Sequence, residues 1–111
     1  MVKALTVYKA SAGSGKTFTL ATEYIKLLVK NPTSYRNILA VTFTNKATEE
    51  MKMRILSQLY GIWKHLPDSS SYLKRIKEDT GFTEELISQR AGESLHLLLN
   101  NYNYFRVETI D

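Results

Sequence analysis

The sequence predicts an α/β fold in which a small parallel sheet is flanked by helices. Three observations predict it. Strand and helix patterns alternate over the first 63 residues, a small Gly-rich turn directly follows the first strand, and residues 37–43 form a nearly continuous apolar run. Such a run is typical of a strand covered on both faces of a parallel sheet. The order strand, helix, strand, helix predicts a right-handed crossover connection between parallel strands.

The first strand and the first helix are separated by a tight turn. Ala4–Tyr8 (ALTVY) is apolar and rich in β-forming residues, and the small residues Ser11–Gly15 end it. A helix is expected from Thr17 to about Lys30, with a broad apolar face made of Phe18, Leu20, Ala21, Tyr24, Ile25, Leu27 and Leu28. Asn31-Pro32 ends this helix, because proline cannot continue helical hydrogen bonding.

The second strand leads into a second helix. Asn37–Phe43 (NILAVTF) is the strand, and Thr44-Asn45 offers side-chain oxygens for an N-cap. The helix that follows has its apolar positions at Ala47, Met51, Ile55 and Leu59.

The chain changes character after the loop at Pro67–Ser71. A short helix around Tyr72–Glu78 ends near Thr80-Gly81, and Thr83 caps a longer helix whose face holds Ile87, Ala91, Ser94, Leu95, Leu98 and Tyr102. Phe105–Ile110 returns to strand-like alternation. We therefore divide the chain into residues 1–63 as the first part of the sheet domain, 64–104 as a helical insertion, and 105–111 as a return to the sheet.

Composition excludes several classes of protein. The 111 residues contain no cysteine, which excludes disulfide frameworks, thiolate zinc sites and cysteine nucleophiles. No apolar run approaches the roughly 20 residues of a membrane span, and no signal peptide is recognisable, so we expect a soluble, cytoplasmic protein without membrane partners. Residues 1–64 hold ten Lys/Arg against three Glu, whereas residues 65–111 hold five against eight acids. The basic half indicates either a polyanionic partner or simple solubility.

The stretch Ala10-Ser11-Ala12-Gly13-Ser14-Gly15-Lys16-Thr17 lies between the first strand and the first helix. It matches the phosphate-binding P-loop pattern, except that Ala10 stands at the first glycine position. Gly13 and Gly15 let the backbone N–H groups approach phosphate oxygens, Lys16 supplies a charge to the β- and γ-phosphates, and the Thr17 hydroxyl can bind Mg²⁺. Close packing of strand against helix also selects small residues, but it does not explain the Lys-Thr pair.

The segment Leu39–Arg54 reads LAVTFTNKATEEMKMR, and the chain ends in V-E-T-I-D. Together with the A-S-A-G-S-G-K-T loop, these segments resemble the UvrD/Rep family of superfamily 1 DNA helicases, in particular the branch that contains RecB and AddA. The resemblance covers residues 4–63 closely and 95–111 loosely. It implies a P-loop NTPase fold of the RecA-like type, ATP and Mg²⁺ as cofactors, and DNA as partner.

The resemblance also implies DNA contacts. T-F-T-N-K-A-x-x-E-M is motif Ia of the family, which touches single-stranded DNA, and this role falls on Thr42, Phe43, Thr44, Asn45 and Lys46. Thr109 begins what looks like the next DNA-contacting motif. An exposed aromatic ring can stack on bases, worth about 1 to 3 kcal/mol per base. From spacing alone, Phe43 is equally the last core residue of its strand and Thr44-Asn45 only a helix cap.

This sequence departs from the family in two ways. No glutamine-containing segment precedes the first strand, and the acidic Walker B pair, the water-orienting glutamine, the arginine finger and the second motor domain are missing. Asp111 ends a segment too polar for the buried strand that normally presents a Walker B aspartate. His65 and His96 do not form a zinc site, and Lys74–Lys77 is a solvated helix face.

These observations predict the N-terminal ATP-binding part of a 3′ to 5′ DNA helicase of repair and recombination, with Lys16 and Thr17 as its catalytic contribution. The resemblance also implies a nuclease domain or a partner subunit for the longer protein. The alternatives are another P-loop NTPase or small-molecule kinase, and a nucleotide- or DNA-binding module without turnover. The isolated chain is expected to self-associate through exposed sheet edges.

Overall fold

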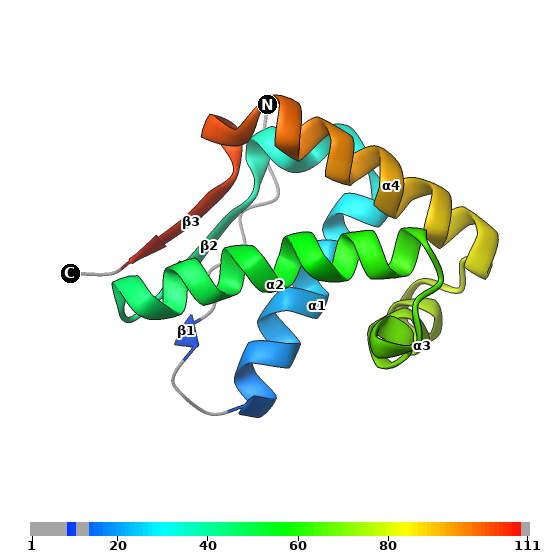
Figure 1. The fold of residues 1–111 in the computed structure, drawn as a ribbon, viewed down its shortest axis with the longest axis horizontal. Coiled ribbons are helices and arrows are strands. Elements are labelled where there is room, and N and C mark those ends of the chain that lie inside the picture. Colours follow the sequence, from blue (N-terminus) through cyan, green and yellow to red (C-terminus); the bar gives the residue numbers. More distant parts are fainter. Residues whose placement is uncertain (1–8, 11–13, 110–111) are drawn as a thin grey trace.

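The computed structural model describes residues 9–10 and 14–109, and it has a three-stranded sheet with helices gathered to one side (Figure 1). The elements in chain order are β1 (Lys9–Ala10), α1 (Ser14–Lys30), η1 (Pro32–Asn37), β2 (Leu39–Thr42), α2 (Asn45–Trp63), η2 (Pro67–Ser69), α3 (Ser70–Thr80), α4 (Glu84–Asn100), η3 (Tyr102–Tyr104) and β3 (Arg106–Thr109). The three η elements are short 3₁₀ helices. The strand expected at Ala4–Tyr8 lies outside the described residues.

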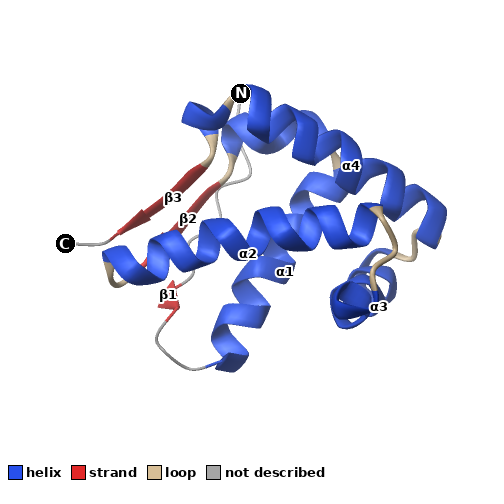
Figure 2. Cartoon of the chain, in the orientation of Figure 1, coloured by secondary structure: helices blue, strands red, loops and turns tan. Residues whose placement is uncertain are grey.

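The sheet confirms the predicted mixed α/β class and its parallel strands. Its order is β1-β2-β3, and both neighbouring pairs are parallel. The prediction that the second strand is covered on both faces is wrong for the described part of the chain. Ala40 and Thr42 are buried, but Leu39 and Val41 on the opposite face remain partly exposed. Helix α2 contacts β2 and β3, and α1 contacts β1, so the helices supply the buried face (Figure 2).

Helix α1 has the predicted apolar face. Tyr24, Ile25 and Leu28 are almost completely buried, and burial raises the pKa of the Tyr24 hydroxyl. The helix begins at Ser14, three residues before the predicted start, so Ser14 and Gly15 belong to its first turn. Its last carbonyls are bonded from α4, because Arg90 Nη1 donates to Val29 O at 2.8 Å and to Lys30 O at 3.0 Å. A cation at this end also complements the helix dipole.

Helix α2 begins as predicted, with Thr44 as its N-cap: the Thr44 hydroxyl accepts a hydrogen bond from the Ala47 backbone N–H at 3.0 Å. It ends in a Schellman turn. The Leu66 N–H donates to Gly61 O and the His65 N–H to Ile62 O, while His65 has the left-handed φ of 59°.

Helices α3 and α4 also follow the predicted signals. Gly81 (φ 74°) ends α3, and the Thr83 hydroxyl accepts from the Leu86 N–H at the start of α4. The predicted apolar face of α4 is buried, except that Tyr102 lies beyond the helix, in η3, and is 46% exposed. Both helices pack into one hydrophobic core with α1 and α2. Whether 64–104 is an insertion in the longer family fold stays a prediction.

Candidate functional site

Three segments with predicted functional roles begin at the same edge of the sheet. In the parallel register, Ala10 at the end of β1 pairs with Thr42 at the end of β2, and Thr42 pairs with Thr109 at the end of β3. The carboxyl ends of strands in an open parallel sheet are the usual place for ligands. The start of the predicted phosphate loop therefore lies at the same sheet edge as both predicted DNA-contacting segments.

The predicted phosphate loop is described only in part. Ser11, Ala12 and Gly13 lie outside the described residues, whereas the backbone of Ser14, Gly15 and Lys16 forms the first turn of α1. Helix N-termini present backbone N–H groups that no intrahelical carbonyl accepts, and these groups attract anions. The position of this turn fits the predicted role in phosphate binding.

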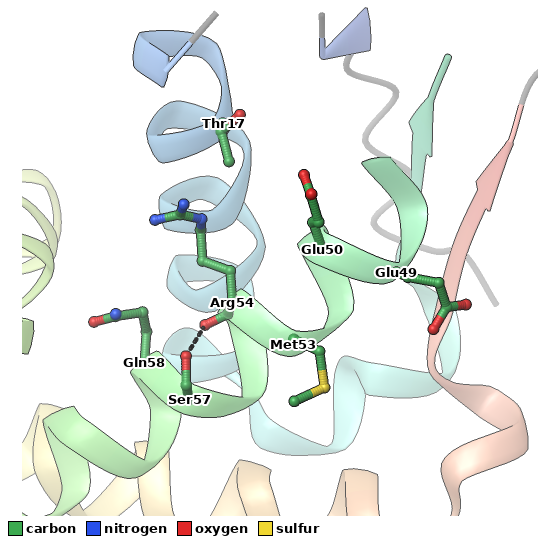
Figure 3. A pocket seen from close by; sticks show the side chains of 7 residues that line it. All are labelled: Thr17, Glu49, Glu50, Met53, Arg54, Ser57 and Gln58. Atoms are coloured by element: carbon green, nitrogen blue, oxygen red, sulfur yellow. Dashed lines mark hydrogen bonds between the residues drawn. The ribbon is translucent and has the colours of Figure 1, made fainter. Parts of the chain in front are cut away.

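An open cavity of about 790 Å³ lies between Thr17 and one face of α2. Its lining residues are Thr17, Glu49, Glu50, Met53, Arg54, Ser57 and Gln58 (Figure 3). Arg54 extends from α2 toward α1, and its Nη1 donates to the Tyr72 hydroxyl of α3 at 3.0 Å. The sequence motifs did not identify these α2 residues as part of a cavity. The spacing of Glu50, Arg54 and Gln58, four residues apart, is the signal that places them on one helix face.

The loop between β2 and α2 presents the predicted motif Ia side chains. Phe43 is 47% exposed, and Asn45 and Lys46 are exposed as well. This exposure contradicts the interpretation of Phe43 as a core residue. The alternative interpretation of Thr44 as a helix cap is confirmed, since the Thr44 hydroxyl accepts a hydrogen bond from the Ala47 backbone N–H.

Thr42, predicted to touch DNA, is buried. Its side chain has no exposed surface, and its Oγ1 lies 2.6 Å from Thr48 Oγ1 and 3.3 Å from Thr44 O. Thr109 Oγ1 lies 2.7 Å from the same Thr48 hydroxyl. Burial alternates along β2, and Thr42 points to the face that the helices cover. The Thr42 hydroxyl therefore holds the loop rather than facing a ligand.

The weaker candidates make structural contacts of their own. His96 Nδ1 bonds to Gly92 O within α4, and its ring lies against Trp63. In the basic run, Ile76 is buried, Lys77 pairs with Glu84, and Arg75 pairs with Asp79. Asp111 lies outside the described residues. The described residues contain no cluster of three His, Asp or Glu side chains that could hold a metal ion. No helix of the described part is long and apolar enough to span a bilayer.

Comparison with known proteins gives one family match. The family of the UvrD/REP helicase N-terminal domain matches residues 2–104. No solved structure matches the chain.

Curated relatives include three kinds of protein. The RecBCD enzyme subunit RecB of Haemophilus influenzae is 40% identical over 62 residues, which is 50% of this chain and 5% of the relative. An ATP-dependent helicase/nuclease subunit of Clostridium novyi is 34% identical over 101 residues, 89% of this chain and 8% of the relative. A probable DNA helicase II homolog of Rickettsia conorii is 47% identical over 55 residues, 48% of this chain and 8% of the relative. The chain thus spans less than a tenth of the length of these relatives.

Proposed function

Because this chain belongs to the UvrD/REP helicase N-terminal domain family, we propose that it forms the ATP-binding first part of a DNA helicase. Its parallel sheet is the beginning of a RecA-like P-loop fold, and the parent protein couples ATP hydrolysis to movement along single-stranded DNA. The observation that carries this proposal is the register of Ala10, Thr42 and Thr109, which lie at one sheet edge, where we propose that the phosphate loop and both DNA-contacting segments begin.

Residues Ala10–Thr17 bind the nucleotide in this proposal. The N–H groups at the start of α1 and the small residues before it receive the phosphates, Lys16 stabilises negative charge on the transferred γ-phosphoryl group, and the Thr17 hydroxyl binds Mg²⁺. Hydroxyl oxygen is a suitable ligand for this hard cation. The first helical turn at Ser14 and the position of Thr17 beside an open cavity support the assignment.

Phe43, Asn45 and Lys46 contact the DNA strand. The exposed Phe43 ring can stack on a base, and the amide and ammonium groups next to it can bind phosphates. The buried Thr42 and the exposed N-cap Thr44 hold this loop, and Thr109 leads into the second DNA-contacting segment.

The direction of movement, the biological role and the partners of the parent protein are proposed by analogy with the relatives. We propose 3′ to 5′ translocation, a role in double-strand-break repair, and a partner subunit or attached nuclease for the parent protein. The names of two relatives support the last of these, since one is part of a RecBCD enzyme and the other is a helicase/nuclease subunit.

Replacement of the exposed aromatic tests the DNA contact. Phe43→Ala should weaken binding of the chain to fluorescently labelled oligo(dT) by about 1 to 3 kcal/mol, measured by anisotropy at low ionic strength. Tyr60→Ala is the matched control, because Tyr60 is also 47% exposed but lies near the far end of α2. A sharp loss of thermal stability with unchanged DNA affinity would show that Phe43 serves packing.

A further inference from the structure

We propose that Thr48 is a positioning residue, which holds the two DNA-contacting segments in one arrangement through a chain of hydroxyl hydrogen bonds. The inference rests on the proposed function, since it concerns the loop that carries Phe43, Asn45 and Lys46, which we assign to DNA, and the segment that Thr109 begins. Thr48 lies in the first turns of α2 and is 8% exposed, so it does not itself face a ligand.

The hydroxyl hydrogen bonds join α2, β2 and β3. Thr48 Oγ1 on α2 lies 2.6 Å from Thr42 Oγ1 on β2 and 2.7 Å from Thr109 Oγ1 on β3. The tip of β3 ends beside the first turn of α2 (Figure 1). Thr42 and Thr109 are also direct partners in the strand register. One side chain of α2 therefore ties together the ends of two parallel strands.

The direction of this chain follows from the number of protons. Each threonine hydroxyl has one proton to donate. Thr42 Oγ1 donates to Thr44 O at 3.3 Å, so it accepts from Thr48. Thr48 has then used its proton, and it accepts from Thr109. The order is Thr109 to Thr48 to Thr42 to the carbonyl of Thr44.

The last acceptor of this series of hydrogen bonds is the carbonyl of Thr44, in the loop between β2 and α2. Thr44 O also accepts the first backbone bond of α2 from the Thr48 N–H at 3.0 Å, and the Thr44 hydroxyl caps Ala47. The loop backbone at Thr44 is thus fixed from β2, from β3 and from α2. Phe43, between Thr42 and Thr44, is held outward by bonds that its own side chain does not make.

A hydrogen-bonded chain of this kind acts as a unit. Removal of the central hydroxyl leaves two buried or half-buried hydroxyls without their partner, whereas removal of a methyl group leaves the chain intact. Thr48→Val therefore removes both side-chain bonds of the central hydroxyl with little change of shape, because valine has the same outline as threonine.

The test compares Thr48→Val with Thr48→Ser in the full 111-residue chain. Anisotropy with labelled oligo(dT) should show at least about fivefold weaker binding for Thr48→Val and binding within about twofold of wild type for Thr48→Ser. Thr22→Val is the matched control: Thr22 is 1% exposed and its hydroxyl donates within α1, to Phe18 O, so DNA affinity should not change. Equal loss in the Val and Ser variants, or no loss in either, would overturn the inference.

A measurement without DNA separates this inference from the proposed function. Amide hydrogen exchange of the apo chain should be faster at residues 43–47 and at Thr109 in Thr48→Val than in Thr48→Ser. If Phe43→Ala leaves DNA binding unchanged, or the wild type does not bind, the proposed DNA contact fails while faster exchange still supports the positioning role. Unchanged exchange in Thr48→Val contradicts the positioning role whatever the DNA result.

Discussion

Gly92 of α4 lies against the indole ring of Trp63 of α2, with no room for a side chain between them. A Cβ atom at residue 92 would stand 2.5 Å from Trp63 Cδ1 and 2.6 Å from Trp63 Nε1. The close approach lets α2 and α4 pack against each other, and it is reinforced by Ser88 Oγ, which donates to Trp63 O at 2.8 Å.

Gly92→Ala should therefore destabilise the fold by about 1 to 3 kcal/mol, because the indole must move. Alanine normally stabilises a helix interior relative to glycine by about 1 kcal/mol. A loss of stability in Gly92→Ala would therefore indicate the steric conflict with Trp63. Urea unfolding, followed by the fluorescence of Trp63, the only tryptophan of the sequence, compares the stability of Gly92→Ala with that of wild type. In a Trp63→Ala background, where circular dichroism replaces fluorescence, the same change should be neutral or stabilising. Destabilisation of equal size in both backgrounds would exclude the steric explanation.

His65→Gly should stabilise the protein. His65 has φ 59°, a left-handed conformation that costs a residue with a Cβ roughly 1 to 2 kcal/mol. Part of the gain is lost to the greater freedom of glycine in the unfolded chain, so we expect a net gain of about 0.5 to 1 kcal/mol in the free energy of unfolding. Lys64→Gly is the control, because its φ of −94° suits any residue. A gain at Lys64 as large as at His65 would contradict the strain argument.

Asp79→Asn should remove a stabilisation that depends on pH. The hydrogen bond from Lys26 holds the pKa of Asp79 below its ordinary value of 3.8, with help from the charges of Lys26 and Arg75. Burial alone would lower the pKa of Lys26, but the hydrogen bonds and charges of Glu23 and Asp79 outweigh it and raise that pKa. Because the folded-state pKa of Asp79 is depressed, its contribution is present above pH 3.8 and disappears as the pH falls through the folded-state value.

The midpoint of urea unfolding checks this dependence. Asp79→Asn should be less stable than wild type at neutral pH, and the difference should vanish in strong acid. Glu78→Gln, which removes an exposed carboxylate from the same helix, serves as control. A difference between Asp79→Asn and wild type that persists undiminished in acid would rule out the ionic origin.

The 111-residue chain alone should not hydrolyse ATP at a measurable steady-state rate. Phosphoryl transfer also needs a carboxylate for Mg²⁺, a group that orients water and a further cation, and within this chain we assign only Lys16 and Thr17 to the reaction. Phosphate release with and without single-stranded DNA measures this. Robust turnover stimulated by DNA would contradict our assignment and would make Asp111 a candidate metal ligand.

Much of the fold was predictable because its signals are local. The caps at Thr44 and Thr83, the stop at Asn31-Pro32 and the apolar face of α1 each depend on neighbouring residues, and all four are confirmed. The coverage of β2 was not predictable, because an apolar run does not say which face the helices reach. The early start of α1 was missed because glycine and serine favour loops by propensity, although they also occur at helix starts.

For the candidate site, spacing predicts a phosphate loop and a motif Ia loop but does not predict the direction of each side chain. Thr42 and Lys46 belong to one motif, yet the structure buries the first and exposes the second. The contact of Thr48 with Thr109 joins residues 61 positions apart, and no local pattern in a single sequence indicates such a pair.

The most direct test of the central claim is ATP-dependent unwinding by the proposed parent helicase, compared between its Lys16→Ala and Lys30→Ala variants. Both substitutions remove one lysine from α1, but Lys16 lies in the first turn, which we assign to the phosphate loop, and Lys30 is an exposed residue at the opposite end. We predict that Lys16→Ala abolishes unwinding with an unchanged circular dichroism spectrum, while Lys30→Ala unwinds like wild type. Unwinding by Lys16→Ala at near the wild-type rate would contradict the assignment of residues 10–17 as the ATP-binding loop.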